Sequence, residues 1–296
     1  MTVAQSSNDI PSVSLTRRFF RLLVGNMLLL LGLALLGAII AFTVLGYLFV
    51  DLELARLNSA PISQPPSMEH WFGTDAVGRS ILALLVIGTP KTLLIGLLAG
   101  VCGITIGTCL GFFAGYVRGW ADTVIRIVSD VLFVIPILFL LVFIIEYFPV
   151  GAIWMMGIVI GVLSWMGTAR TVRAQVLTLR ERAFVNMARA SGAGTWRIIF
   201  VELMPNLTSY LAASFVQAVS GGILFSIGLE VLGLGPANSQ TLGWSIWWAN
   251  DYGAVLRGFW WWWGSPVVII VMIFLGLFMT SLGLDRIANP RLRGTS

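Results

Sequence analysis

The sequence predicts an all-α integral membrane protein with six transmembrane helices. Hydrophobic residues make up 58% of the 296 residues, charged residues make up 10%, and the mean hydropathy is +0.93. A soluble domain of this length carries about 25% charged residues, and a helix needs about 20 apolar residues to cross a bilayer. Six runs reach that length, at roughly residues 22–50, 91–115, 122–146, 150–170, 205–235 and 264–285.

Composition argues against several other classes of protein. The net charge is +5, but the 18 basic residues stand beside the apolar runs and form no separate basic face, so we expect no binding of nucleic acid. Cys102 and Cys109 would lie about 10 Å apart along one helix, too far for a disulfide. His70 is the only histidine, and without a cluster of cysteine and histidine we expect no metal site.

The first apolar run follows a group of arginines, as the core of a signal peptide does. Arg17, Arg18 and Arg21 precede it, but the run at 22–50 is much longer than the roughly 7–15 residues of a cleavable core. We therefore expect a retained first span. Six spans then place both termini on the same side of the membrane.

The basic residues favour one orientation of these spans. If the N-terminus is cytoplasmic, the segments on that side hold 14 of the 18 basic residues. The other four, Arg56, Arg79, Lys91 and Arg257, fall on the outer side. Because cytoplasmic segments carry the excess of arginine and lysine, we expect both termini in the cytoplasm.

Glycine and proline indicate how the second and third spans pack. The second span has glycine at positions 96, 100, 103, 107, 111 and 115. These spacings of three and four keep the glycines on one slowly drifting face, where another helix can come close. In the third span, Pro136 removes an intrahelical hydrogen bond and is expected to kink the helix.

An arginine-rich segment of about 35 residues separates the fourth and fifth spans. Its first part predicts a short helix from Ala183 to about Ser191, which Gly192 can end in a left-handed conformation. Thr195 can cap a second short helix, and Pro205 suits the first turn of the fifth span. We expect a helix–turn–helix bracket across the cytoplasmic face, with small residues at its turn.

The chain shows no site for catalysis or for ATP. The ATP-binding loop needs a lysine preceded by glycine and followed by a hydroxyl residue, whereas Lys91, the only lysine, follows Pro90. A single histidine leaves no hydrolase triad. Asp75 and Arg79 are better explained as an i,i+4 pair that steadies a short helix at the outer surface. We expect no catalytic residues and no cofactor in this chain.

Four residues are candidates for lining a transport pathway. Ionisable residues inside spans are costly and are functional candidates by default. Asp130 is one such candidate, although a pairing with Arg126 is the favoured alternative. Glu230 could contact solute at the outer mouth, or pair with a neighbouring subunit. Trp247 and Trp248 belong to a tryptophan-rich outer segment; they could stack on sugar rings or simply anchor the chain at the membrane interface.

Several motifs together resemble one family of membrane proteins. "AxxxGA" at 188–193 followed by "ELMPN" is similar to the EAA loop of bacterial ABC importer permeases. "HWFGTDAVGR", "AGYVRGWADTVIRIVSDVLFVIP", "LGLG" and "NPRLR" resemble, in the same order, segments of dipeptide and oligopeptide permease C subunits. Three residues match the EAA pattern: Ala188, Gly192 and Pro205. Four residues differ from it: Asn186, Met187, Glu202 and Met204.

The resemblance implies a type I ABC importer permease (MetI-like) fold in the bacterial inner membrane. It implies that a coupling helix docks on a cytoplasmic ATPase through the following residues: Ala183, Asn186, Met187, Ala188, Gly192 and Ala193. The implied partners are a second homologous permease, two ATPase subunits that bind ATP and Mg²⁺, and an extracytoplasmic solute-binding protein. The implied organisation is a segment 1–85 with the first span and outer loop, and a core at 86–296 with a coupling loop at about 171–204.

The solute and the energy source leave alternatives open. The resemblance favours a dipeptide or oligopeptide, the tryptophan-rich segment keeps an oligosaccharide in view, and nickel or another solute remains a third choice. A secondary transporter driven by protons or sodium would show inverted repeats and several carboxylates at mid-membrane depth. We find no convincing repeat, and the acidic residues lie mostly near span ends.

Overall fold

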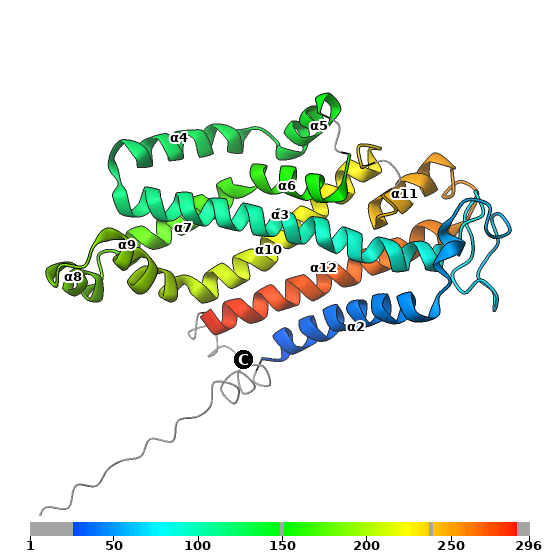
Figure 1. The fold of residues 1–296 in the computed structure, drawn as a ribbon, viewed down its shortest axis with the longest axis horizontal. Coiled ribbons are helices and arrows are strands. Elements are labelled where there is room, and N and C mark those ends of the chain that lie inside the picture. Colours follow the sequence, from blue (N-terminus) through cyan, green and yellow to red (C-terminus); the bar gives the residue numbers. More distant parts are fainter. Residues whose placement is uncertain (1–25, 149–150, 237–238, 289–296) are drawn as a thin grey trace, which may run out of the picture.

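The computed structural model describes residues 26–148, 151–236 and 239–288, and the regular elements in these ranges are helices (Figure 1). Within the described ranges, one isolated antiparallel β-bridge joins Thr74 to Ser80. The elements are α2 (Met27–Phe49), η1 (Leu52–Ala55), α3 (Ile81–Val117), α4 (Gly119–Val134), α5 (Ile137–Tyr147), α6 (Ile153–Leu163), α7 (Trp165–Leu179), α8 (Ala183–Ala190), α9 (Thr195–Arg197), η2 (Ile198–Leu203), α10 (Met204–Val231), α11 (Leu242–Asp251) and α12 (Trp260–Ala288).

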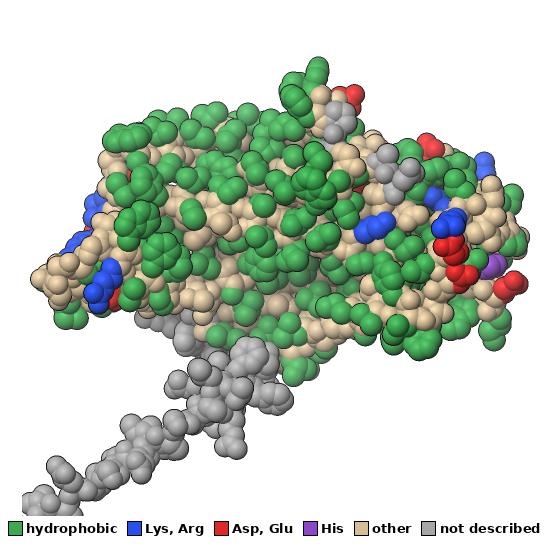
Figure 2. Space-filling view, in the orientation of Figure 1, with side chains coloured by type: hydrophobic (Ala, Val, Ile, Leu, Met, Phe, Trp, Pro, Cys, Tyr) green, Lys and Arg blue, Asp and Glu red, His purple; other side chains and the backbone are tan. Residues whose placement is uncertain are grey.

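All six expected spans correspond to helices or bent helix pairs in the described part of the chain. Four continuous helices are long and apolar enough to cross a membrane: Met27–Phe49, Ile81–Val117, Thr195–Val231 and Trp260–Ile287. The pairs α4 with α5 and α6 with α7 supply two more if each pair is one span. Figure 2 shows hydrophobic side chains over the middle of the visible face and charged ones mainly at its two ends. The predicted all-α membrane fold is confirmed.

Both bent spans break at an identifiable residue. Between α4 and α5 the axis turns by 86°, where Ile135 is extended and Pro136 precedes the first turn of α5. This confirms the kink expected at Pro136, and the bend is large enough to separate two helices. The 43° bend between α6 and α7 was not expected. It falls at Ser164, whose amide donates to the carbonyl of Gly161, three residues back, so that the α-helical pattern is broken there.

The second span begins earlier than the apolar pattern indicated. We expected it to start near residue 91, after Pro90, but α3 begins at Ile81 and continues through Pro90. The prediction was wrong because membrane helices tolerate proline when other groups compensate.

The glycines of α3 provide the close packing that their spacing predicted. A Cβ atom at Gly100 would lie 2.5 Å from Val219 of α10, and one at Gly107 would lie 2.6 Å from Thr168 of α7. The row drifts around α3 as expected: positions 96 and 100 face α10, and positions 103, 107, 111 and 115 face α6 and α7. α3 is therefore the central helix on which α6, α7 and α10 pack.

The first span packs on the last one (Figure 1). A Cβ at Gly32 of α2 would lie 2.6 Å from the backbone nitrogen of Thr280 of α12, so the two backbones touch. The Asn26 side chain, at the start of α2, donates to the carbonyl of Gly283 at 2.7 Å. The start of α2 and the end of α12 therefore lie together, as an even number of spans requires.

Candidate functional site

The short helix α8 lies at the end of the molecule, beyond the helices that pack around α3 (Figure 1). It spans Ala183–Ala190, which confirms the short helix expected there. Gly192 follows it with φ +79°, and the amide of Ala193 donates to the carbonyl of Ala188 at 3.0 Å. Gly192 therefore ends α8 in the left-handed conformation that the sequence predicted.

One face of α8 is buried against three spans. Val185 is fully buried in a cluster with Val176 of α7, Leu203 of η2 and Phe112 of α3. Phe184 and Ala188, on the same side of α8, are half-buried against this cluster. Since a close-packed interior transmits displacement, moving α8 must move the ends of α3, α7 and the α10 helix together.

Two arginines attach α8 and its neighbouring turn to the end of α3. Arg180 donates to the carbonyl of Tyr116 at 2.9 Å. The guanidinium of Arg189 lies 5.4 Å from the centre of the Tyr116 ring, within the range of a cation–π contact. The α8 segment is thus held by polar contacts as well as by its apolar face.

The opposite face of α8 is open. Ala183, Asn186, Met187 and Ala190 are exposed, with Met187 at 64% of its accessible area. Among the six residues predicted to couple to an ATPase, four are exposed on or beside this face (Ala183, Asn186, Met187 and Gly192), and two are half-buried at its base (Ala188 and Ala193). The structure brings the six together in one place, and their contact with a partner stays a prediction.

The second helix of the expected bracket is not a separate helix. Gly194, not Thr195, is its N-cap, and the helix runs on without a break from Thr195 to Val231. Between α9 and α10 the turns widen to the π form, so that the amide of Met204 donates to Ile199, five residues back. Because Pro205 has no N–H, a widened turn just before it keeps the remaining carbonyls close to donors. This single helix links α8 to the opposite end of the molecule.

Two ion pairs join α4 to α7 near the α8 end. Asp130 bonds with Arg170 at 2.6 Å, so the expected pairing with Arg126 on the same helix is wrong. The guanidinium of Arg170 also lies 4.6 Å from the centre of the Phe133 ring, which fixes it beside Asp130. Asp122 receives two hydrogen bonds from Arg173, a pair that the sequence reading missed because nothing in the sequence showed which helix α4 would face.

Glu230 lies at the other end of the same long helix, and it is buried. It is 1% exposed and faces the Thr241 hydroxyl and the backbone N–H groups of Gly243 and Trp244, at the start of α11. Neither carboxylate oxygen makes a hydrogen bond of good geometry. Glu230 therefore packs against the start of α11 without a hydrogen bond to it in this conformation, and contact with a solute stays a prediction.

The loop before α11 is held by polar groups of α3. Lys91 donates to the carbonyl of Ser239 at 2.8 Å, and the Thr92 hydroxyl accepts from the amide of Leu242 at 3.0 Å. Gly88 of the same helix leaves no room for a side chain, since a Cβ there would lie 2.6 Å from the carbonyl oxygen of Gln240. The start of α11 is thus fixed by α3.

A buried arginine connects α11 to the loop before α3. Arg79 bonds with Asp75 at 2.6 Å, with side-chain exposures of 3% and 0%. The predicted i,i+4 pairing is present, but the pair is not on an exposed short helix. It lies in a tight turn in which Gly73 and Gly78 have positive φ. The guanidinium of Arg79 lies 4.9 Å from the centre of the Trp244 ring and 4.7 Å from that of Trp248.

The rings of Trp247 and Trp248 on α11 pack against neighbouring side chains. Trp248 stacks on Tyr252 at 5.3 Å and contacts Arg79 as well. Trp247 is half-buried and meets Trp248 edge-on, at 5.4 Å and 82°. The ring of Trp248 is therefore engaged in packing, which removes the main reason to expect sugar rings at this position.

These features define a class of protein: a multi-pass membrane subunit whose spans are connected, through one packed cluster, to a short helix with an open face. The comparison with known proteins makes the class specific. Residues 107–294 match the family described as binding-protein-dependent transport system inner membrane component, and the chain belongs to this family. It is a membrane-embedded permease subunit of an ABC importer and not itself an enzyme, since ATP hydrolysis lies in separate subunits.

Individual relatives share most of the chain. It is 29% identical to the dipeptide transport system permease protein DppC of Bacillus subtilis, over 96% of this chain and 88% of the relative. It is 34% identical to the oligopeptide transport system permease protein OppC of Haemophilus influenzae, over 74% and 70%. It is also 34% identical to the glutathione transport system permease protein GsiD of Pectobacterium atrosepticum, over 59% and 58%.

Proposed function

We propose that this chain forms half of the translocation pathway of an ATP-driven importer for dipeptides or oligopeptides. Support for the solute comes from the relatives, which are named for dipeptide, oligopeptide and glutathione transport. The observation that carries the mechanism is the open face of α8, whose buried side packs on three spans at once. An ATPase that binds this face can move those spans with few intervening contacts.

The proposed coupling site comprises the exposed face of α8 and the turn after it. Ala183 and Gly192 offer little bulk, so a partner groove can come close to the backbone there, and Met187 presents a flexible apolar side chain to it. Asn186 is exposed and can make a neutral hydrogen bond, in place of the charge-assisted bond that a glutamate would make. ATP and Mg²⁺ are held by the ATPase subunits, and their closure pushes α8 together with the ends of α3, α7 and the α10 helix.

We further propose the orientation and the assembly. The α8 end is cytoplasmic, as are both termini, because that arrangement puts 14 of the 18 basic residues inside. The adjacency of Asn26 and Gly283 supports termini on one side. The complete importer contains a second homologous permease, two ATPase subunits and an outer solute-binding protein.

The face of α4 that carries Asp130 is proposed to lie toward the pathway and the second permease. Asp130 and Arg170 are 56% and 51% exposed in the isolated chain. An ion pair exposed on a membrane span is costly against lipid and is normally covered by protein or water. Glu230, Trp247 and Trp248 remain candidates at the other end of the pathway, provided that α11 moves during transport.

Uptake by the reconstituted importer tests the function. The chain, its second permease, the ATPase subunits and the binding protein are assembled in proteoliposomes, and labelled dipeptides and oligosaccharides are offered with and without ATP. We expect peptide uptake that requires ATP and the binding protein. Uptake of an oligosaccharide alone would change the solute, and uptake driven by a proton or sodium gradient without ATP would contradict the mechanism.

A further inference from the structure

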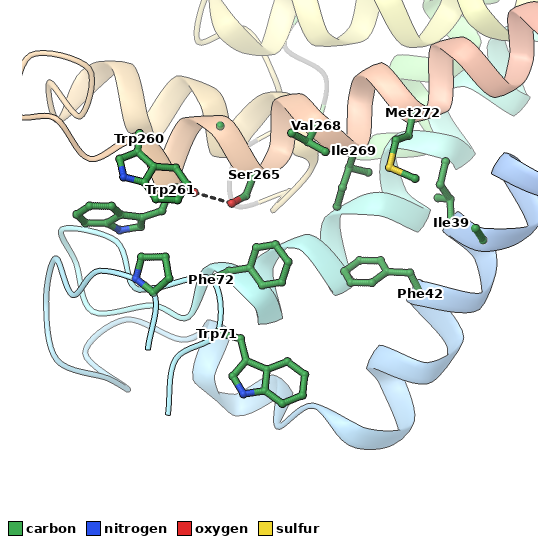
Figure 3. A pocket seen from close by; sticks show the side chains of 13 residues that line it. Ile39, Phe42, Trp71, Phe72, Trp260, Trp261, Ser265, Val268, Ile269 and Met272 are labelled. Carbon is green, nitrogen blue, oxygen red and sulfur yellow. Dashed lines mark hydrogen bonds between the residues drawn. The ribbon is translucent and has the colours of Figure 1, made fainter. Parts of the chain in front are cut away.

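An apolar groove separates α2 from α12 at the end of the molecule that carries α11 (Figure 3). Its volume is about 520 Å³, within the range of about 300–1,000 Å³ that is usual for ligand pockets. Phe42 of α2 and Phe72 of the loop before α3 point toward each other across it, and Met272 of α12 lies at its inner end (Figure 3).

The groove exists because α2 and α12 touch along only part of their length. In the first half of α2 the helices meet at glycine: a Cβ at Gly276 would lie 3.0 Å from Leu36. Toward α11, the large side chain of Trp261 is inserted beside the loop, where it donates to the carbonyl of Thr74 at 3.2 Å. A Cβ at Gly73 would lie 2.7 Å from this indole, so the loop and the ring hold the two helices apart.

The lining is almost entirely apolar, and three of its four polar side-chain donors are already engaged within the protein. The Ser265 hydroxyl donates to the carbonyl of Trp261 at 2.7 Å, and the indole of Trp71 donates to Met68 at 3.0 Å. Trp260 is 62% exposed at the mouth of the groove. Because a water molecule needs two to four polar partners to remain in a cavity, the groove suits a wholly apolar occupant.

The length of the groove corresponds to one leaflet of a bilayer. Ala38 and Phe42 lie 11 and 7 residues before the end of α2 at Phe49, which places them about 16 and 10 Å from that end. One leaflet of the hydrocarbon core is about 15 Å thick. The groove also continues the lipid-facing surface, because Val268 in its wall is 58% exposed and Val44 on α2 is 52% exposed.

We propose that this groove binds one acyl chain of a phospholipid from the leaflet at the α11 end, which is the outer leaflet in the proposed orientation. Trp71 and Trp260 lie at headgroup level, where tryptophan gathers, and the chain passes between Phe42 and Phe72 toward Met272. The bound chain completes the packing of the first span on the last. The site depends on membrane location alone and not on the identity of the solute.

Two glycines allow a matched test. A Cβ at Gly264, in the groove wall, meets no atom within 4 Å, and the same holds for Gly37, which is exposed on α2 outside the groove. Gly264→Phe therefore fills the groove, while Gly37→Phe adds the same ring to the lipid-facing surface. Ala38→Trp fills the groove from the α2 side and replaces Gly264→Phe if that variant fails to assemble.

The assembled importer is placed in nanodiscs that contain a phospholipid with a diazirine near the end of one acyl chain, and the cross-linked residues are mapped by mass spectrometry. We expect labelling concentrated at Phe42 and Met272, reduced several-fold by Gly264→Phe and unchanged by Gly37→Phe. Stripping lipid should also lower the Tm of the wild type and of Gly37→Phe more than that of Gly264→Phe.

Two results would overturn the proposal. One is labelling spread evenly over the exposed side of α2 with no concentration in the groove. The other is a protein occupant, which benzoylphenylalanine in place of Phe42 would reveal as a cross-link to the second permease or to another copy of this chain.

Discussion

Gly192 and Gly194 lie in the same loop and both have open space around them, but their backbones differ. A Cβ at either position meets no atom within 4 Å. Gly192 has φ +79°, whereas Gly194 has φ −69° and ψ +161°, which any residue adopts. The backbone conformation, and not crowding, therefore makes glycine necessary at position 192, and the two positions form a natural matched pair.

Gly192→Thr should disturb the coupling helix, and Gly194→Thr should not. A β-branched residue in the left-handed region costs roughly 1–3 kcal/mol, while threonine is about as good as glycine at the N-cap that Gly194 occupies. We expect Gly192→Thr to insert in the membrane normally but to lose ATP-driven uptake or ATPase association. Equal uptake by both variants, measured in proteoliposomes, would show that the left-handed turn is not required.

Arg79→Lys should destabilise the α11 end although it keeps the charge. A lysine cannot lie flat against Trp244 and Trp248 or fill the same fork of donors beside Asp75. We expect a loss of about 1–3 kcal/mol, seen as a lower Tm in detergent. Arg257→Lys, at an exposed position near the same end, is the control and should leave the Tm unchanged. A normal Tm for Arg79→Lys would mean that the indole contacts contribute little.

At this scale the sequence predicted conformation better than partners. Gly192 was placed correctly because the backbone constraint of glycine is local; Pro205 lies in the first turn of α10, but inside the continuous helix that begins at Thr195. The pairing of Arg79 with Asp75 was also predicted, because the two lie one helical turn apart in the sequence. The partner of Asp130 and the indoles that contact Arg79 were not predicted, because they come from α7 and α11, and local spacing does not show which helices meet. The burial of Glu230 likewise depends on how α11 folds back over the end of α10.

The helices of the core are fixed by where their backbones can touch, and α3 shows this most clearly. Its row of glycines was visible in the sequence, and so was its consequence, close helix packing. The start of α3 was not, because Pro90 is tolerated inside the helix. The bend at Ser164 was also not predicted, because a serine in an apolar run does not by itself mark a break in a helix.

Gly107→Ala should destabilise the packing of α3 on α7. The added methyl would lie 2.6 Å from the Cβ of Thr168 and 2.7 Å from the carbonyl oxygen of Trp165, and such overpacking costs about 1–3 kcal/mol. Gly167→Ala, on α7 itself, meets nothing within 4 Å and should be neutral or slightly stabilising. Unfolding in detergent measures both. A neutral Gly107→Ala would contradict the close approach of the two helices.

The two ion pairs between α4 and α7 should differ in strength. Asp122 and Arg173 are 16% and 25% exposed and share two hydrogen bonds, whereas Asp130 and Arg170 are about half exposed and share one. Because exposed pairs are screened by solvent, double-mutant cycles should give a larger coupling energy for Asp122–Arg173. The reverse order in the isolated chain would contradict the geometry, and a rise for Asp130–Arg170 on assembly would support its burial against the second permease.

For the whole molecule, one helix connects the coupling site to the opposite end. The helix from Thr195 to Val231 has 37 residues, about 55 Å at 1.5 Å per residue. Its first turns pack in the cluster under α8, and Glu230 at its far end faces the start of α11. A displacement of α8 therefore reaches α11 through a single continuous element, interrupted only by the widened turns before Pro205.

The overall architecture could be predicted from the sequence because each membrane span is a long continuous run of apolar residues. The family could be predicted because its motifs occur in the same order in this chain. The connection between the α8 end and the α11 end of the molecule could not be predicted from the sequence. We expected the segment after Gly192 to form a separate short helix, and only the structure shows that it is the beginning of the fifth span. The division at residues 85 and 86 stays a prediction, and both of these residues lie inside α3.

Site-directed cross-linking to the ATPase tests the central claim most directly. Met187→Cys, on the open face of α8, and Leu256→Cys, 94% exposed at the α11 end, are each introduced after Cys102 and Cys109 have been replaced, in membranes that contain the complete importer. We predict that Met187→Cys forms a cross-link to the ATPase subunit whose yield changes with ATP, and that Leu256→Cys forms none. Cross-linking of the ATPase through Leu256→Cys, or its absence at Met187→Cys in an importer that still transports, would contradict the account.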